Sequence, residues 1–129
     1  MKSNAEIELL EKLIGQLDGL HSEISQLARK SPNDGLNNFK LKLVNNVLAS
    51  GNALLGERYK PFEDFDQFDD VELPTNSDVT MILAQYIEQT ERFRSDHVVN
   101  HMHRWQYVVN GQPSGFNARM PSQVGGEKK

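Results

Sequence analysis

The side chains best suited to chemistry lie close together in the last third of the sequence, at Arg94, His97 and His101. On a helical wheel with about 100° per residue, both histidines continue the line of an apolar stripe that precedes them, and Arg94 lies at its edge. The stripe consists of Val79, Leu83, Tyr86, Thr90 and Phe93. The inner face of the predicted helix therefore changes from apolar to basic and histidine-rich.

This change of face has two interpretations. In the first, the helix breaks near Ser95 and Asp96, whose side chains are suited to cap a new helix, and that second helix buries the displaced apolar stripe. In the second, the helix is continuous and its three basic residues line a polar site at the end of a bundle, because inward-facing polar groups are costly unless they are paired. Residues 105–109 are the one strand-like stretch in this region.

The histidine pair also has the spacing of a metal-chelating pair. His97 and His101 are four residues apart, which places both rings on one face of a helix. Asp96 points away from that face, and the sequence supplies no obvious third ligand nearby. We therefore expect no metal and no other cofactor, and name His97 and His101 as the residues that a metal would use.

Arg94 and His101 share a helix face and have six residues between them. This arrangement resembles that of the HEPN ribonucleases, small all-α proteins in which an arginine and a histidine meet near a dimer interface and act on the RNA phosphodiester. A histidine of near-neutral pKa beside a fixed cation is physically suited to that reaction. The resemblance is confined to this helix, and Ser95 stands where the family usually has its own polar residue. It implies that Arg94 and His101 are catalytic, with His97 as a neighbour.

The segment from Phe62 to Leu73 has the most unusual composition, with six acidic residues and no basic ones. Its phenylalanines recur every third residue, at Phe62, Phe65 and Phe68. One interpretation is that the rings seal one end of a bundle beneath a solvated acidic surface. The other is that this loop docks a basic partner, with the rings as anchors and the acids, among them Asp66 and Asp69, speeding association.

The remaining sequence predicts the helices that position these residues. Apolar periodicity indicates helices over residues 3–30, 36–58 and 77–109, the last either continuous or broken near residue 95. Residues 1–111 are expected to form one domain, and 112–129 a flexible, disordered tail. The first helix carries a heptad seam that requires a partner, within the chain or in a second copy. The seam consists of Leu10, Leu13, Leu17, Leu20, Ile24 and Leu27.

Composition narrows the class of protein. The chain has 129 residues, a net charge of −4 and no cysteine, which disfavours nucleic-acid binding and excludes disulfides and thiolate chemistry. No apolar run approaches the ~20 residues of a membrane span, and the first residues do not resemble a secretory signal. We therefore expect an all-α, cytoplasmic, antiparallel bundle of three to four long amphipathic helices that forms a homo-dimer or higher oligomer.

The expected function is non-enzymatic. The heptad seam, the acidic loop and the lack of a dense catalytic cluster favour a helical protein–protein interaction module, such as an adaptor, chaperone, immunity protein, antitoxin or regulatory subunit. Its partner is expected to be another protein with a basic surface. The alternatives are a small helical ribonuclease or other hydrolase centred on Arg94, His97 and His101, and a metal-binding bundle.

Overall fold

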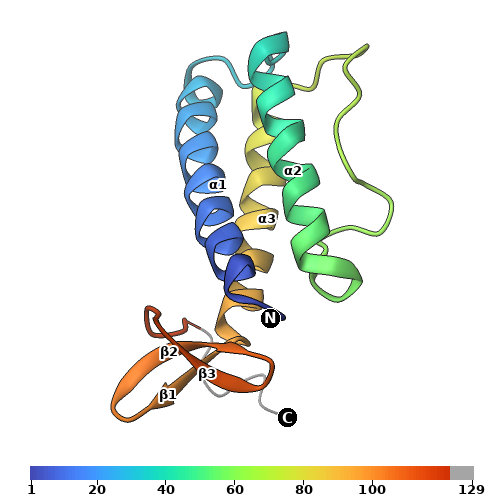
Figure 1. Cartoon of the computed structure of the whole chain (residues 1–129). Helices are drawn as coiled ribbons and strands as arrows, with labels where there is room; N and C mark the ends of the chain where they lie inside the picture. The colour runs from blue at the N-terminus through green and yellow to red at the C-terminus, as the bar shows by residue number, and fades with distance from the viewer. Residues whose placement is uncertain (123–129) are drawn as a thin grey trace.

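The computed structural model describes residues 1–122, which form three helices followed by a three-stranded antiparallel sheet (Figure 1). The helices are α1 (Asn4–Lys30), α2 (Asn38–Tyr59) and α3 (Asn76–Ser95). The strands are β1 (Val98–His101), β2 (Arg104–Val109) and β3 (Gln112–Asn117), and they lie in the order β1-β2-β3. The protein is therefore mixed α/β, and the all-α prediction is wrong.

The three helices form a bundle, with the sheet at the end where α1 begins and α3 ends (Figure 1). Side-chain caps fix two of the helix starts. Asn37 accepts a hydrogen bond from the Lys40 amide at 2.8 Å, and Thr75 accepts one from the Asp78 amide at 3.1 Å. The core between the helices is apolar and includes Leu10, Val44 and Leu83, each with no exposed side-chain surface.

The heptad seam of α1 packs inside its own chain. Four seam residues are buried in the core and two are half-buried against it. The buried ones are Leu10, Leu13, Leu17 and Ile24, and the half-buried ones are Leu20 and Leu27. The predicted oligomer stays a prediction. The seam side chains already pack within their own chain, so another surface has to form any interface between subunits.

The predicted helix over 77–109 is divided, because α3 ends at Ser95 and the chain continues into β1 and β2. The apolar residues that the helical wheel places on a displaced face after Arg94 lie mainly in these strands, Val98 in β1 and Trp105 and Val109 in β2. Asn110 and Gly111 follow the predicted helix in the sequence and form the two-residue turn between β2 and β3, with φ of 53° and 78°. An Asn-Gly pair suits the end of a helix as well as a hairpin turn, since each needs a positive φ, and here the two preceding valines favour the hairpin.

The first hairpin has a less favourable turn. Met102 and His103 join β1 to β2 with φ of 53° and 67°, a backbone conformation that residues other than Gly, Asn and Asp rarely adopt.

Within β2, the side chain of Gln106 is buried, and hydrogen bonds satisfy its amide group. The amide donates to the His101 carbonyl at 3.2 Å and accepts from the Gly115 amide at 2.9 Å. This side chain links β2 to both neighbouring strands.

The expected flexible tail is ordered in its first part. Residues 112–117 form β3, and residues 118–122 continue along the end of α3. The remainder of that predicted tail, residues 123–129, lies outside the described residues. Within residues 1–122, no helix is apolar over a length sufficient to cross a lipid bilayer.

Candidate functional site

Arg94, the first residue with predicted chemistry, is buried at the end of α3 and is 1% exposed. Its Nε and Nη2 atoms each donate to one carboxylate oxygen of Glu91 at 2.8 Å. The same guanidinium donates to the carbonyl oxygens of Arg119 at 2.9 Å and Met120 at 3.0 Å. Four hydrogen bonds therefore direct Arg94 to this chain's own atoms, and the guanidinium holds residues 119–120 against the helix.

Glu91 completes this attachment. Its carboxylate also accepts hydrogen bonds from the Ser95 hydroxyl at 3.2 Å and from the Ser122 hydroxyl at 2.9 Å. Burial raises the pKa of the Glu91 carboxyl, but hydrogen bonds from Arg94 and Ser122 outweigh it and lower the pKa to about 2. We call Glu91, Arg94 and the segment 119–122 that they bind the C-terminal latch.

The two histidines no longer share a helix face with Arg94. His97 follows the end of α3, where its Nδ1 donates to the Phe93 carbonyl at 2.6 Å. The ring centroids of His97 and Phe93 are 4.2 Å apart. Burial lowers the pKa of His97, against the raising effect of that hydrogen bond. His101 is exposed at the end of β1. Across residues 1–122, no three His, Asp or Glu side chains are grouped so that they could hold a metal ion.

The acidic loop, residues 62–73, lies along α2 on the side away from α1 (Figure 1). Two asparagines on one face of α2 fasten its backbone. Asn45 donates to the Phe68 carbonyl at 3.0 Å and accepts from the Phe68 amide at 2.9 Å. Asn52, seven residues later, donates to the Asp66 carbonyl at 3.0 Å and accepts from the Tyr86 hydroxyl at 2.7 Å. The loop is held at two points about two helical turns apart.

The three phenylalanines of this loop form a chain of edge-to-face contacts. The ring centroids of Phe62 and Phe65 are 6.3 Å apart, and those of Phe65 and Phe68 are 5.0 Å apart. All three rings are half-buried against the core. The three rings therefore lie together, although the loop contains no helix.

A hollow of about 510 Å³ opens beside the first two rings. Its apolar lining includes Phe62 and Phe65 from the loop and Met81 from α3, and Glu63 and Asp64 also line it. Met81 is 56% exposed although it is a large apolar side chain. We call this feature the acidic hollow. It combines an apolar surface that water does not favour with a rim of negative charge.

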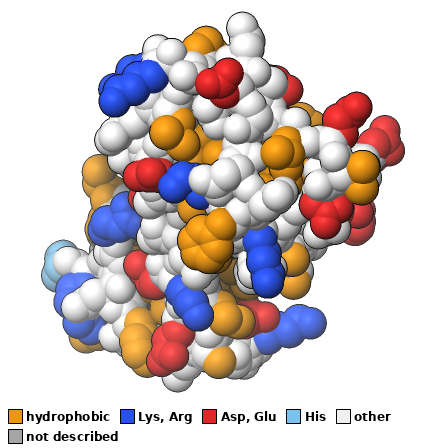
Figure 2. Space-filling model, turned by 90° about the horizontal axis from the view of Figure 1, so that it is seen from above, with side chains coloured by type: hydrophobic (Ala, Val, Ile, Leu, Met, Phe, Trp, Pro, Cys, Tyr) orange, Lys and Arg blue, Asp and Glu red, His pale blue; other side chains and the backbone are white. Residues whose placement is uncertain are grey.

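The carboxylates around the hollow are mostly turned to solvent. Figure 2 shows acidic side chains gathered around a few hydrophobic ones on the side where Figure 1 draws this loop. Asp66 forms an ion pair with Lys60, and Asp69 accepts a hydrogen bond from the Val71 amide at 2.8 Å. For Glu63, Asp64 and Asp70, the described part of the chain offers no ion pair.

Composition identified the loop residues, but the sequence analysis missed Met81 and the two asparagines. Met81 is two residues from Val79, so on a helical wheel it lies nearly opposite the buried stripe. A large apolar residue on the solvent side of a helix was a signal that could have identified it. Asn45 and Asn52 carried no such signal, because their partners are backbone groups of a distant loop.

Comparison with known proteins gives no relative from which to transfer a function. The chain matches no protein-family model, no curated protein and no solved structure. The proposals below therefore rest on the geometry alone.

Proposed function

We propose that this protein is a non-enzymatic interaction module that binds a basic segment of another protein at the acidic hollow. The observation that carries the proposal is the apolar lining of the half-buried Phe62 and Phe65 and the exposed Met81, beside the carboxylates of Glu63 and Asp64. Exposed apolar surface rimmed by polar groups is typical of protein–protein contacts.

The chemistry of the hollow supports a basic partner with an apolar side chain. Six carboxylates within residues 62–73 attract Lys and Arg and raise the rate of encounter at low salt. One apolar side chain between those basic residues would fill the hollow and supply most of the affinity. We therefore expect a partner segment with a Leu, Ile, Met or Phe flanked by basic residues.

The attachment of the loop supports the same proposal. Asn45 and Asn52 fix the loop backbone on α2, and edge-to-face contacts fix the rings. A surface that is already ordered loses less conformational entropy when it binds than a free loop does. We further propose that binding takes place in the cytoplasm, the compartment expected in the sequence analysis.

Binding of defined peptides tests this function. The probes are fluorescent Lys- and Arg-rich peptides with one central Leu or Phe, together with matched peptides in which Ser replaces that residue. Fluorescence anisotropy gives the affinity for wild type and for Met81→Ser. We expect the apolar-centred peptides to bind wild type about tenfold more tightly than the Ser-centred ones, and this preference to be lost in Met81→Ser.

Two charge variants complete the design. The loop variant carries Glu63→Gln, Asp64→Asn and Asp70→Asn; its control carries Glu8→Gln, Asp18→Asn and Glu57→Gln, which removes the same charge from exposed positions elsewhere. The loop variant should lose about tenfold in affinity at low salt, and the control should lose much less. Equal losses in the two variants would show that net charge, and not the hollow, attracts the peptide.

A further inference from the structure

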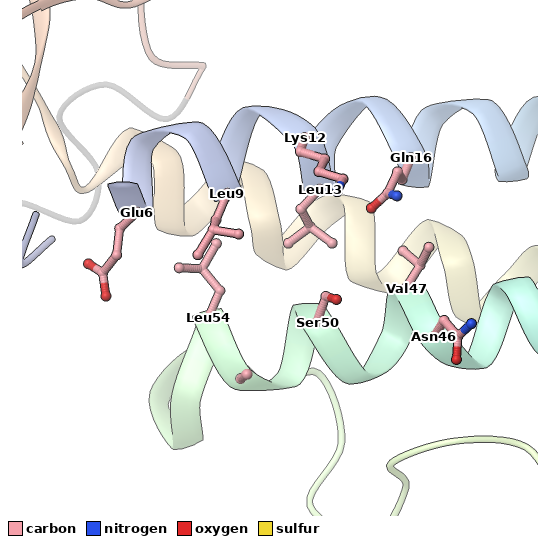
Figure 3. Close-up of a pocket in the computed structure, with 10 residues that line it drawn as sticks. Glu6, Leu9, Lys12, Leu13, Gln16, Asn46, Val47, Ser50 and Leu54 are labelled. Carbon is pink, nitrogen blue, oxygen red and sulfur yellow. The ribbon is translucent and has the colours of Figure 1, made fainter. Parts of the chain in front are cut away.

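A second surface lies between α1 and α2, where the two helices leave a groove of about 360 Å³ (Figure 3). Leu9 and Leu54 point toward one another across this groove (Figure 3). Leu13 and Val47, which are 2% and 7% exposed, line its deeper part. Leu9 itself is 56% exposed, so the groove has an apolar side chain that its own chain does not cover.

The charges on the α1 wall of the groove are arranged symmetrically. Glu6 and Lys12 both line it, and each is three residues from Leu9, on opposite sides along the helix. The α2 wall contributes the uncharged side chains of Asn46 and Ser50. The groove thus presents one acid and one base about a central exposed leucine, with no excess of either sign.

From this arrangement we infer that the groove is the interface of a homodimer, in which the α1 helices of the two copies pack antiparallel about a two-fold axis near Leu9. Reversing α1 about Leu9 brings Glu6 level with Lys12 of the partner subunit, and Lys12 level with Glu6 of the partner subunit. The two leucines are then buried together at the centre. A two-fold interface requires one surface to complement itself, and this surface does so in both charge and hydrophobicity.

A partner of a single charge sign fits the groove less well, because either Glu6 or Lys12 would face a like charge. The dimer also leaves the acidic hollow accessible, since the loop lies on the side of α2 away from α1 (Figure 1). Self-association and partner binding therefore use separate surfaces, the first between α1 and α2 and the second between the acidic loop and α3.

The apolar centre is tested by two matched variants. Leu9→Ser and Met81→Ser each remove a side chain that is 56% exposed, one in the groove and one in the acidic hollow. Sedimentation equilibrium should give wild type and Met81→Ser a mass about twice the chain mass of 14.7 kDa, and Leu9→Ser a mass near that of one chain. A wild-type protein that remains monomeric at the highest soluble concentration would overturn the proposal.

The charge arrangement is tested by reversal. Glu6→Lys and Lys12→Glu each place like charges at both symmetric contacts, and should weaken the dimer about tenfold; the double variant restores both pairs and should recover the wild-type constant. Glu6 also accepts a hydrogen bond from the Lys2 amide at 2.7 Å, so circular dichroism must confirm that α1 is retained. Single variants that match wild type, or a double variant that does not recover, would contradict the antiparallel packing.

The two proposals fail separately. If Met81→Ser loses peptide binding and keeps the dimer while Leu9→Ser does the reverse, both proposals are supported. Loss of both properties in Leu9→Ser with its fold retained would mean that peptide binding requires the dimer, which contradicts the separation of the two surfaces. A dimer that binds no peptide would overturn the proposed function alone.

Discussion

In both the C-terminal latch and the acidic loop, irregular backbone is held against a helix, but the two regions differ in whether their charged side chains are buried or exposed. In the latch, Arg94 is buried and each charge is paired, so that Glu91 keeps a pKa of about 2. In the acidic loop, uncharged asparagines hold the backbone, and most carboxylates face solvent. The paired charges of the latch stabilise the fold, whereas most carboxylates of the acidic loop are exposed to solvent.

Candidates for function are therefore the charged residues that the fold leaves exposed beside apolar surface. Arg94 has the residue type and neighbours of a catalytic group, yet its hydrogen bonds are directed to the chain's own tail. Glu63 and Asp64 belong to no recognisable motif, yet they border an apolar hollow. Removing charge should therefore cost stability at the latch and cost binding at the loop.

The largest expected effect is on the latch. Arg94→Met leaves Glu91 without its main partner and releases residues 119–120, and should lower the free energy of unfolding by about 3 kcal/mol. The matched control is Arg92→Met, which removes an exposed i,i+4 pair with Glu88 and should cost less than about 0.5 kcal/mol. Urea denaturation measures both. Similar costs for the two variants would remove the distinction between latch and surface.

The pH dependence of stability sharpens the same distinction. The folded-state pKa of Glu91, about 2, lies below the ordinary value of 4.5. A carboxyl group with a lowered pKa stabilises the fold fully above its unfolded pKa, and this stability is lost as the pH falls from about 4.5 to about 2. Glu91→Gln should lack that part of the curve, which amounts to about 3 kcal/mol. Urea denaturation at each pH gives the free energy of unfolding of wild type and of Glu91→Gln. If the two free energies change with pH in the same way, Glu91 is not responsible for the loss of stability in acid.

A smaller effect is expected where the acidic loop is fastened. Asn45→Ala removes both hydrogen bonds to the Phe68 backbone and should cost about 1–2 kcal/mol. Asn38→Ala, at an exposed position of the same helix, is the control and should have little effect on stability. Hydrogen exchange should show faster exchange of the Phe68 amide in Asn45→Ala alone. Unchanged protection would mean that other contacts order the loop.

The smallest expected effect on stability is that of the loop variant Glu63→Gln, Asp64→Asn, Asp70→Asn. These side chains are exposed, so their neutralisation should change the free energy of unfolding by no more than about 0.5 kcal/mol. Peptide affinity is nevertheless expected to fall. A destabilisation as large as that of Arg94→Met would show that the carboxylates stabilise the fold, and the contrast between the two regions would disappear.

The helices could be predicted from the sequence because each carries its own apolar period. The predictions 3–30 and 36–58 correspond to α1 (Asn4–Lys30) and α2 (Asn38–Tyr59). The sheet could not be predicted in the same way, because its short strands follow α3 directly and their apolar residues also fit a helix whose face has rotated. Asn110 and Gly111 suited the end of such a helix as well as a hairpin turn.

The site was predictable only where composition alone identifies it. A run of acids with phenylalanine at every third position marks the loop without knowledge of the fold. The role of Arg94 was not predictable, since its backbone partners lie 25 and 26 residues further along the chain. The same holds for Met81, which meets Phe62 and Phe65 only after the loop is folded against α3.

The acidic hollow, and not the Arg94 region, is the proposed binding surface. Two-dimensional NMR of the labelled protein, during titration with a Lys- and Arg-rich peptide that has one central Leu, would locate the residues that the peptide contacts. We predict that the amide signals of residues 62–65 and of Met81 shift first and furthest, while those of Arg94 and His101 stay in place. Shifts centred on Arg94, His97 and His101, with the loop signals unchanged, would contradict this account.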